Sequence, residues 1–411
     1  MKLVIHRGAH EIGGTCIQLS DQGTTILLDL GLPLRKESKH PELGGVKPDA
    51  ILISHPHQDH FGLIERFSHI PVYIGRVSKS LMEAGRLFSL QKPFPHEFRF
   101  MEAWKKFALG AFQITPFLMD HSSPEAFALL IECAGKKVFY SGDFRAHGRK
   151  KVLFENMVKK PPKSPDVLIM EGTMLRRDNN DFPTEAAVEK AILKVIKDQN
   201  KITFLISSSQ NIDRIVSAYR ACKRSGNILV IDLYTAWVLE QMKVVTQHVP
   251  QMDWPEVRVY IPGNQYDLVK KHPKIFGSFK AQVFHYRIQE QELLESPQCY
   301  LYLTRNSNFR QIRKFMGQGP INLIYSQWMG YLKEDNWDSF GAKQMAGFQQ
   351  ETGVKFVYAH TSGHAPLVDL KTFAQAINPK MLIPVHTEYP EEFKEHFENV
   401  VEMADGKEVE I

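Results

Sequence analysis

The densest group of chemically active side chains in this sequence is the stretch SHPHQDH, which directly follows the apolar run AILI. Its four potential metal ligands are His55, His57, Asp59 and His60. Residues two apart in an extended segment face the same side, so His55 and His57 can point together at one ion. Asp59 and His60 come where the chain turns and can reach a second ion. Neutral imidazole and carboxylate are the ligands that suit zinc, and also manganese or iron.

More candidate ligands stand at the ends of other strand-like runs. They are Asp120, His121, Asp143 and His386. A lone histidine is most often structural, and each of these residues alone is a weak signal. Together with the first stretch, they supply a complete set of ligands for two metal ions.

The elements that must position these ligands begin with short strands and hairpins. Hairpin turns are predicted at Asp21-Gln22-Gly23 and at Ala134-Gly135. The expected strands are residues 2–6, 15–19, 24–30, 50–54, 72–74, 112–119, 127–133, 137–140 and 167–170.

Around residue 180 the pattern changes to alternating helices and strands. Thr184 is predicted to cap a helix, with Glu185 favourably placed against the helix dipole. Strands that alternate with helices indicate an α/β unit with a largely parallel sheet. The strands expected in it are residues 202–206, 228–231, 257–261, 300–303 and 321–325, and apolar strands resume at 354–358 and 381–385.

The composition is that of a globular protein without a membrane segment. Hydrophobic residues make up 43% and charged residues 24%, and no apolar run approaches the roughly 18 residues of a membrane span. The N-terminus lacks the pattern of a secretory signal peptide. The four cysteines are scattered without a CxxC pair, which predicts reduced thiols in a cytoplasmic protein and argues against a cysteine zinc site.

The net charge of +5 is partly concentrated between Phe144 and Lys163. The basic residues of this segment are Arg145, Arg149, Lys150, Lys151, Lys159, Lys160 and Lys163, and its one acidic residue is Glu155. The simpler interpretation of such a run is a solvated face. The alternative is a path for a polyanion.

The HxHxDH phrase, then His121, then Asp143 in SGDF, in that order, resembles the metallo-β-lactamase superfamily. The resemblance implies an αββα sandwich with two metal ions at one edge, most simply Zn²⁺, with Mn²⁺ as the alternative. It implies that Asp29, in ILLDLG, orients the ligands from behind. The implied ligands of one metal are His55, His57 and His121, those of the other are Asp59, His60 and His386, and Asp143 bridges the two.

Three further phrases resemble the β-CASP nucleases, the family of ribonuclease J and of the cleavage and polyadenylation endonuclease. Glu171 in MEGTM resembles motif A, His364 in HTSGHA motif B, and His386 in PVHTE motif C. The resemblance implies an α/β β-CASP domain inserted into the sandwich. The expected domains are residues 1–180 and 355–411 for the metallo-β-lactamase part and 181–354 for the insertion.

The resemblance also implies residues that would contact nucleic acid. These candidates are Arg145, Asn211, Arg214 and Ser362. The segment around Asn211 looks like the family's nucleic-acid-binding turn, but Gln210 stands where a serine is usual. For Asn211 and Arg214, packing at the start of a helix is an equal alternative.

The function that the resemblance implies is metal-dependent hydrolysis of RNA. A hydroxide activated by two metals would attack phosphorus and leave a 5′-phosphate and a 3′-hydroxyl. Asp59, Glu171 and His364 are the predicted catalytic residues, with His364 as the general acid and Glu171 as its orienting partner. A histidine at motif C, here His386, favours RNA over DNA. The predicted partner is single-stranded RNA and no membrane, and a homodimer or an RNA-processing partner stays open.

Three alternatives remain at this point. A nuclease for single-stranded DNA, or for both nucleic acids, would keep the same site. A non-catalytic RNA-binding subunit is disfavoured because every ligand position is filled. A small-molecule hydrolase is disfavoured by the insertion and by motifs A and B. The choice between endonuclease and 5′-exonuclease is open.

Overall fold

The computed structural model describes residues 1–411 except 36–37, 39, 198–200, 307, 317–319 and 334–338. The chain divides into two compact units. Unit 1 comprises Met1–Met82, Pro93–Asn180 and Ser362–Ile411. Unit 2 comprises Glu83–Lys92 and Asp181–Thr361. Among the described helices, none is long and apolar enough to pass through a lipid bilayer.

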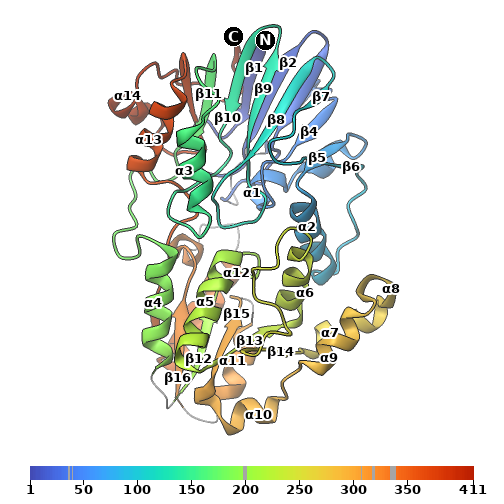
Figure 1. Ribbon diagram of the computed structural model, residues 1–411, viewed down its shortest axis with the longest axis vertical. Coiled ribbons are helices and arrows are strands. Elements are labelled where there is room, and N and C mark those ends of the chain that lie inside the picture. The colour runs from blue at the N-terminus through green and yellow to red at the C-terminus, as the bar shows by residue number, and fades with distance from the viewer. Residues whose placement is uncertain (36–37, 39, 198–200, 307, 317–319, 334–338) are drawn as a thin grey trace. The chain divides into compact units, whose positions relative to one another are not determined.

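Unit 1 is built on two β-sheets (Figure 1). The first sheet has the order β19-β1-β2-β3-β4-β5-β6. Its strands are β1 (Lys2–Arg7), β2 (Cys16–Asp21), β3 (Thr24–Leu28), β4 (Ala50–Leu52), β5 (Val72–Ile74), β6 (Phe98–Phe100) and β19 (Glu408–Glu410). The second sheet has the order β18-β11-β10-β9-β8-β7. Its strands are β7 (Phe107–Leu109), β8 (Phe112–Leu118), β9 (Phe127–Cys133), β10 (Lys136–Tyr140), β11 (Val167–Glu171) and β18 (Met381–Val385).

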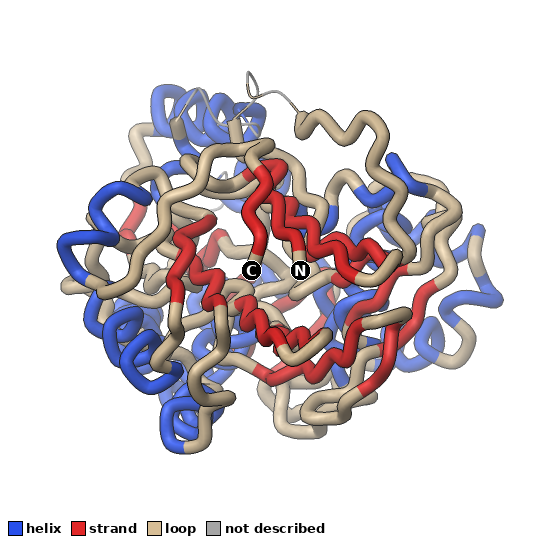
Figure 2. Tube along the Cα trace, turned by 90° about the horizontal axis from the view of Figure 1, so that it is seen from above, coloured by secondary structure: helices blue, strands red, loops and turns tan. Residues whose placement is uncertain are grey.

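The main core of unit 1 lies between these two sheets. It joins Leu3 and Ile17 of the first sheet to Ile114 and Leu129 of the second. Helices cover the outer faces: α1 (Gln58–Phe61), η1 (Ile64–Phe67) and α2 (Arg76–Phe88) lie on the first sheet, and α3 (Lys151–Lys159), α13 (Leu367–Ile377), η4 (Pro390–Glu392) and α14 (Phe393–His396) lie on the second. The predicted αββα sandwich is therefore confirmed. The two termini lie side by side (Figure 2), because β1 pairs with β19.

Both predicted hairpins are present, and their backbone explains their residue types. Gln22 and Gly23 connect β2 to β3 with φ values of 45° and 77°. Ala134 and Gly135 connect β9 to β10 with φ values of 47° and 79°. Two consecutive positive φ values define the type I′ turn, whose twist matches that of the flanking strands and whose second position favours glycine.

Parallel pairing brings the ends of the site-bearing strands to one edge of unit 1. Within the first sheet β3 runs parallel to β4, and within the second β10, β11 and β18 run parallel to one another. The carboxyl ends of parallel strands meet at the same edge of a sheet. The segments that follow β4, β10 and β18 carry His55, Asp143 and His386 respectively, and β11 ends on Glu171.

Unit 2 is an α/β unit whose sheet has the order β14-β13-β15-β12-β16-β17. All of these strand pairs are parallel, as predicted. The strands are β12 (Ile202–Ile206), β13 (Ile228–Asp232), β14 (Val257–Tyr260), β15 (Tyr300–Thr304), β16 (Ile321–Tyr325) and β17 (Phe356–Tyr358). The helices are α4 (Glu185–Ile196), α5 (Ile212–Ser225), α6 (Leu233–Met242), α7 (Gly263–Lys271), α8 (Pro273–Phe276), α9 (Phe279–His285), α10 (Glu290–Glu295), η2 (Pro297–Cys299), α11 (Phe309–Met316), η3 (Met329–Leu332) and α12 (Ser339–Thr352).

The predicted start of the first helix of unit 2 is confirmed. The side chain of Thr184 accepts a hydrogen bond from the backbone N–H of Ala187, and α4 begins at Glu185. This contact satisfies one of the backbone donors that every helix leaves free at its N-terminus.

Candidate metal centre

The structure brings all seven predicted metal ligands into one cluster. Each of four ligand groups has its donor atoms within 4.8 Å of one another. The groups are His55, His57 and His121; His55, His60 and Asp143; Asp59, His60 and His386; and Asp143, His364 and His386. Because the groups share members, they describe a continuous site along the edge of unit 1.

One end of the cluster is made of histidines that burial keeps neutral. His57 Nδ1 lies 3.0 Å from His55 Nε2 and 3.2 Å from His121 Nε2. Burial lowers the pKa of His57 to about 4. Burial and the neighbouring histidines also hold the pKa of His55 and of His121 well below the ordinary range. Metal binding requires the neutral imidazole, so these three residues are in the protonation state of ligands.

The other end of the cluster combines histidines with carboxylates. Asp59 Oδ2 lies 3.7 Å from His386 Nε2 and 3.9 Å from His60 Nε2. Asp143 Oδ2 lies 3.1 Å from His60 Nε2, 3.6 Å from His55 Nε2 and 3.9 Å from His386 Nε2. The Asp143 carboxylate thus approaches histidines of both implied ligand sets, as a bridging ligand must.

Asp29 orients His60 from behind. Its buried carboxylate accepts hydrogen bonds from the Ser54 backbone N–H at 2.7 Å, the Ser54 hydroxyl at 2.8 Å and the Tyr140 hydroxyl at 2.6 Å. The fourth contact, at 2.8 Å, is with His60 Nδ1. A proton held on Nδ1 by Asp29 leaves Nε2 of His60 to face the cluster.

His121 is oriented by the loop that carries His364. The Gly363 carbonyl accepts a hydrogen bond from His121 Nδ1 at 2.6 Å, so His121 Nε2 is free for a metal. A Cβ atom at Gly363 would lie 3.1 Å from His121 Cε1, so a larger residue would push the loop off the ring. His386 is held on its other side, because its Nδ1 lies 2.8 Å from the Thr15 hydroxyl.

His364 and Glu171 form a charged pair at the border of the cluster. His364 Nδ1 lies 3.0 Å and 3.2 Å from the two carboxylate oxygens of Glu171 and 3.7 Å from Asp143 Oδ2. Burial lowers the pKa of His364, but the charges of Glu171 and Asp143 outweigh it and raise the pKa to about 9. Glu171 itself is 1% exposed and accepts the backbone N–H groups of Phe144 and Thr173. The two carboxylates therefore favour the protonated imidazole, and Glu171 fixes its orientation.

The donor atoms of the cluster fit divalent cations. Within the described part of the chain, the buried atoms Asp143 Oδ1 and His386 Nε2 make no hydrogen bond. Such atoms are costly unless a ligand satisfies them. Burial lowers the pKa of His60, yet Asp143 and Asp29 outweigh it and raise that pKa well above its ordinary range. The site therefore favours positive charge, and its imidazole and carboxylate donors suit zinc or manganese.

The structure gives Arg145 a supporting position instead of the nucleic-acid contact proposed from the sequence. Its side chain is fully buried, pairs with Asp120 at 3.6 Å and donates to the carbonyl of Ser362 at 2.8 Å. Two residues that the sequence interpretation missed also hold Ser362. His147 Nε2 lies 2.9 Å from the carbonyl oxygen of Ser362. The backbone N–H of Ser362 donates to Asn179 Oδ1 at 3.1 Å.

The structure likewise places Asn211 and Arg214 in packing positions, which was the alternative for both. The side chain of Asn211 caps α5 by accepting from the backbone N–H of Arg214. The Arg214 side chain is fully buried, pairs with Glu185 at 3.1 Å and donates to the Ser326 carbonyl at 2.7 Å. Arg214 has no exposed surface with which to touch a nucleic acid. Ser362 is partly exposed, and its hydroxyl oxygen accepts the backbone N–H of His364 at 3.1 Å.

Two family models match the chain. The beta-lactamase superfamily domain matches residues 24–205, and the Zn-dependent metallo-hydrolase RNA specificity domain matches residues 355–411. Both segments contain residues of the cluster.

Curated relatives and a solved structure extend the comparison. Ribonuclease J of Mycoplasma pneumoniae is 23% identical over 94% of this chain and 68% of its own length. Ribonuclease J of Sinorhizobium meliloti is 20% identical over 82% of this chain and 57% of its own length, so this chain spans little more than half of that relative. The crystal structure of a protein of unknown function from Enterococcus faecalis V583 has the same fold, with a TM-score of 0.77 at 20% identity over 99% of both chains. The chain belongs to the metallo-β-lactamase superfamily and, within it, to the ribonuclease J-like β-CASP family.

Proposed function

We propose that this protein is a metal-dependent ribonuclease that hydrolyses phosphodiester bonds of single-stranded RNA. The observation that carries the proposal is a buried cluster of seven metal-binding side chains directly beside a protonated histidine, His364. A group of this kind can protonate the alkoxide that leaves phosphorus.

The seven candidate ligands fall into two sets, one for each cation, with one shared residue. His55, His57 and His121 would hold one divalent cation, Asp59, His60 and His386 the other, and Asp143 both. Bound there, two cations would lower the pKa of a water molecule and neutralise charge on the phosphoryl group. Among these ligands Asp59 is more exposed than Asp143, at 16% against 2% of its side chain. Asp59 is therefore the carboxylate placed to accept a proton from an attacking water.

His364 would deliver the proton that the reaction needs on the other side of phosphorus. Glu171 contacts Nδ1 of the imidazolium, so Nε2–H is the group available to the leaving 3′ oxygen. Donation to that oxygen yields a 3′-hydroxyl, and the attacked phosphate stays on the 5′ side of the next nucleotide. General acid help of this kind contributes about 10²–10⁴-fold to the rate.

Three observations support RNA as the substrate. The family model matched over residues 355–411 is that of an RNA specificity domain, and it contains His364 and His386. The matched relatives from Mycoplasma pneumoniae and Sinorhizobium meliloti are both ribonuclease J. His386 stands where RNA-cleaving members of the family have histidine. Ser362, whose hydroxyl hydrogen is free to donate, remains the proposed phosphate contact beside the site.

We also propose the domain division and location implied by the sequence. Residues 181–354 would form the β-CASP domain, and residues 1–180 and 355–411 the metallo-β-lactamase part, which is supported by the compact unit Asp181–Thr361. The four cysteines are free, with Cys16, Cys133 and Cys222 buried, which supports a cytoplasmic protein.

A cleavage assay tests the function. One single-stranded RNA, labelled at either end, and its DNA counterpart would be incubated with the protein in the presence of zinc or manganese. The control is the Asp59→Ala variant. Release of mononucleotides from the 5′-labelled RNA would identify a 5′-exonuclease, and discrete internal fragments an endonuclease. Equal cutting of DNA would favour the dual-nuclease alternative. No cutting by wild-type protein shown to hold two metals would refute the proposal.

A further inference from the structure

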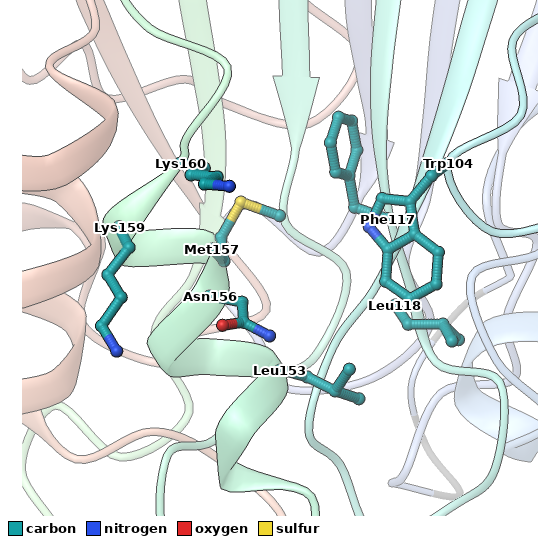
Figure 3. A pocket seen from close by; sticks show the side chains of 8 residues that line it. All are labelled: Trp104, Phe117, Leu118, Leu153, Asn156, Met157, Lys159 and Lys160. Carbon is teal, nitrogen blue, oxygen red and sulfur yellow. The ribbon is translucent and has the colours of Figure 1, made fainter.

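A cavity of about 370 Å³ opens on the outer side of the second sheet of unit 1. Its walls come from α3 on one side and, on the other, from the end of β8 and from Trp104 in the segment between β6 and β7 (Figure 3). The residues that line it are Trp104, Phe117, Leu118, Leu153, Asn156, Met157, Lys159 and Lys160. The volume falls in the range of roughly 300–1,000 Å³ that is typical of sites for small organic groups.

The apolar walls of the cavity are firmly held. Phe117 packs edge-on against Phe139 with ring centroids 5.9 Å apart, and Met157 is 5% exposed in the same core layer. Leu153 points from α3 toward Leu118 across the opening (Figure 3). A rigid slot of this kind is formed before a ligand arrives, so that binding does not have to order the walls.

Trp104 is an unusual residue for its position. Its side chain is 59% exposed, and its backbone has φ of 62°, where bulky residues are rarely found. Its N–H donates to the carbonyl of Pro116 at 2.7 Å, which holds the turn in place beside the cavity. A strained backbone that presents an exposed indole gains little for folding, and such features concentrate at ligand sites.

The polar groups that line the cavity are exposed to solvent. Among the described residues, no carboxylate lies within ion-pair distance of Lys159 or Lys160, and the side-chain amide of Asn156 makes no hydrogen bond. The basic residues next to Trp104 differ, because Lys105 pairs with Glu102 at 3.1 Å and Lys106 with Glu132 at 2.6 Å. The uncompensated positive charge is therefore at the α3 side of the cavity.

We propose that this cavity binds a nucleotide of single-stranded RNA at a distance from the bond that is cut. The base would stack on the indole of Trp104 and lie against the apolar wall, the amide of Asn156 would hydrogen bond to its edge, and Lys159 and Lys160 would neutralise adjacent phosphates. An exposed aromatic face, a free amide and unpaired lysines together match this ligand better than an acidic peptide, which has no planar ring to stack.

Both walls of the cavity continue into segments that hold His121, one of the candidate metal ligands. Leu118 precedes the ligand His121 by three residues, which is about 10 Å of extended chain. Lys150, directly before α3, donates to the carbonyl of His121 at 2.7 Å. This inference rests on the proposed function, because it assigns a second contact to the same substrate.

The test measures binding and cleavage separately as a function of RNA length. Affinity for a labelled RNA of about twenty nucleotides would be measured by fluorescence anisotropy in protein that also carries Asp59→Ala. Trp104→Ala should weaken binding about ten-fold, and Trp104→Phe by much less, because a ring remains to stack. Leu90→Ala is the matched control, since Leu90 is 80% exposed with φ of 58° and lies outside the cavity. It should bind as tightly as the parent.

Cleavage then separates this inference from the proposed function. In otherwise wild-type protein, Trp104→Ala and Asn156→Ala should raise KM for the long RNA and leave kcat/KM for a dinucleotide unchanged. Equal binding and equal KM in the parent and both variants, in protein that cleaves RNA, would overturn the cavity as an RNA site while leaving the ribonuclease intact. If the parent protein binds a polyglutamate peptide, and the variants lose that binding but keep their RNA binding, the cavity would instead be a site for an acidic protein partner. Absence of RNA cleavage by the wild-type protein would instead count against the proposed function.

Discussion

Replacing Glu171 with glutamine tests whether this carboxylate keeps His364, the proposed general acid, protonated. Both carboxylate oxygens of Glu171 contact His364 Nδ1, at 3.0 Å and 3.2 Å. Glutamine has the same shape, and its carbonyl oxygen can still accept the backbone N–H of Phe144, which lies 3.0 Å from Glu171 Oε1. The substitution removes one negative charge from a buried position, and it also replaces the oxygen that accepts the Thr173 N–H with an amide NH2.

The magnitude follows from the charges around His364. Burial lowers its pKa, yet Glu171 and Asp143 raise it from 6.5 to about 9, a difference of roughly 3 kcal/mol between the two protonation states. Glu171 raises this pKa both by its charge and by its hydrogen bond. In the Glu171→Gln variant the pKa of His364 should therefore return toward 6.5. The protonated form of His364 is present at pH values below its pKa and is lost as the pH rises through that pKa. At about pH 7.5 the protonated fraction, and with it the rate, should fall about ten-fold.

The assay is kcat/KM for a labelled single-stranded RNA between about pH 6 and pH 10. The alkaline limb should move about two pH units lower in Glu171→Gln, with most of the rate recovered at the acid end. Bound cations lower the pKa of His364 in both proteins, so the displacement between the two profiles is the measured quantity. Metal content would be determined in each sample.

A matched variant and one result decide the interpretation. Glu189→Gln also neutralises a buried glutamate, which is 3% exposed and pairs with Arg224 in unit 2, and its profile should match the wild type. Identical alkaline limbs in wild type and Glu171→Gln, at equal metal content, would mean that His364 does not donate the proton. A uniform loss at every pH would mean that Glu171 acts through structure alone.

Other predictions concern single groups. His364→Ala should retain both metals and lose about 10²–10⁴-fold in kcat, and normal turnover in metal-replete protein would contradict its role. Arg145→Met should destabilise unit 1 by about 3–5 kcal/mol in urea titrations, because the fully buried Asp120 loses its cation. Thr184→Ala should lower the stability of unit 2 by about 1 kcal/mol, since the cap of α4 is lost, and an unchanged midpoint would contradict the capping contact. Removal of metal by a chelator should lower the unfolding temperature, measured by scanning fluorimetry and restored by zinc.

The ligand cluster could be predicted from the sequence because its signals are local. Three histidines and an aspartate within one short stretch predict a metal site without any tertiary information. The two hairpins are predicted by their two-residue turns. The strands β6, β7 and β19 were not predicted. Each is an edge strand of its sheet and is largely exposed. It therefore lacks the buried apolar run that marks the equally short strand β5.

The positions of Arg145 and Arg214 could not be read from the sequence. Arg145 was proposed as a contact to nucleic acid because it lies in a basic run. Arg214 was proposed because its segment resembles a nucleic-acid-binding turn, with packing as the alternative. Their partners Asp120 and Glu185 are distant in sequence or carry no signal of burial, yet each pair is wholly enclosed. The contacts of His147 and Asn179 with Ser362 were missed for the same reason, because they join segments that only the tertiary fold brings together.

The loop Ser362-Gly363-His364 couples the candidate metal site to whatever ligand contacts the loop. The carbonyl of Gly363 sets the ring of the ligand His121, while the next residue is the acid. A ligand that holds this loop in one conformation raises the affinity of the site for metal. By linkage, the metal must then raise the affinity for that ligand by the same factor. If the protein is the proposed ribonuclease, a substrate that binds this loop weakly would therefore also leave the metal more weakly bound.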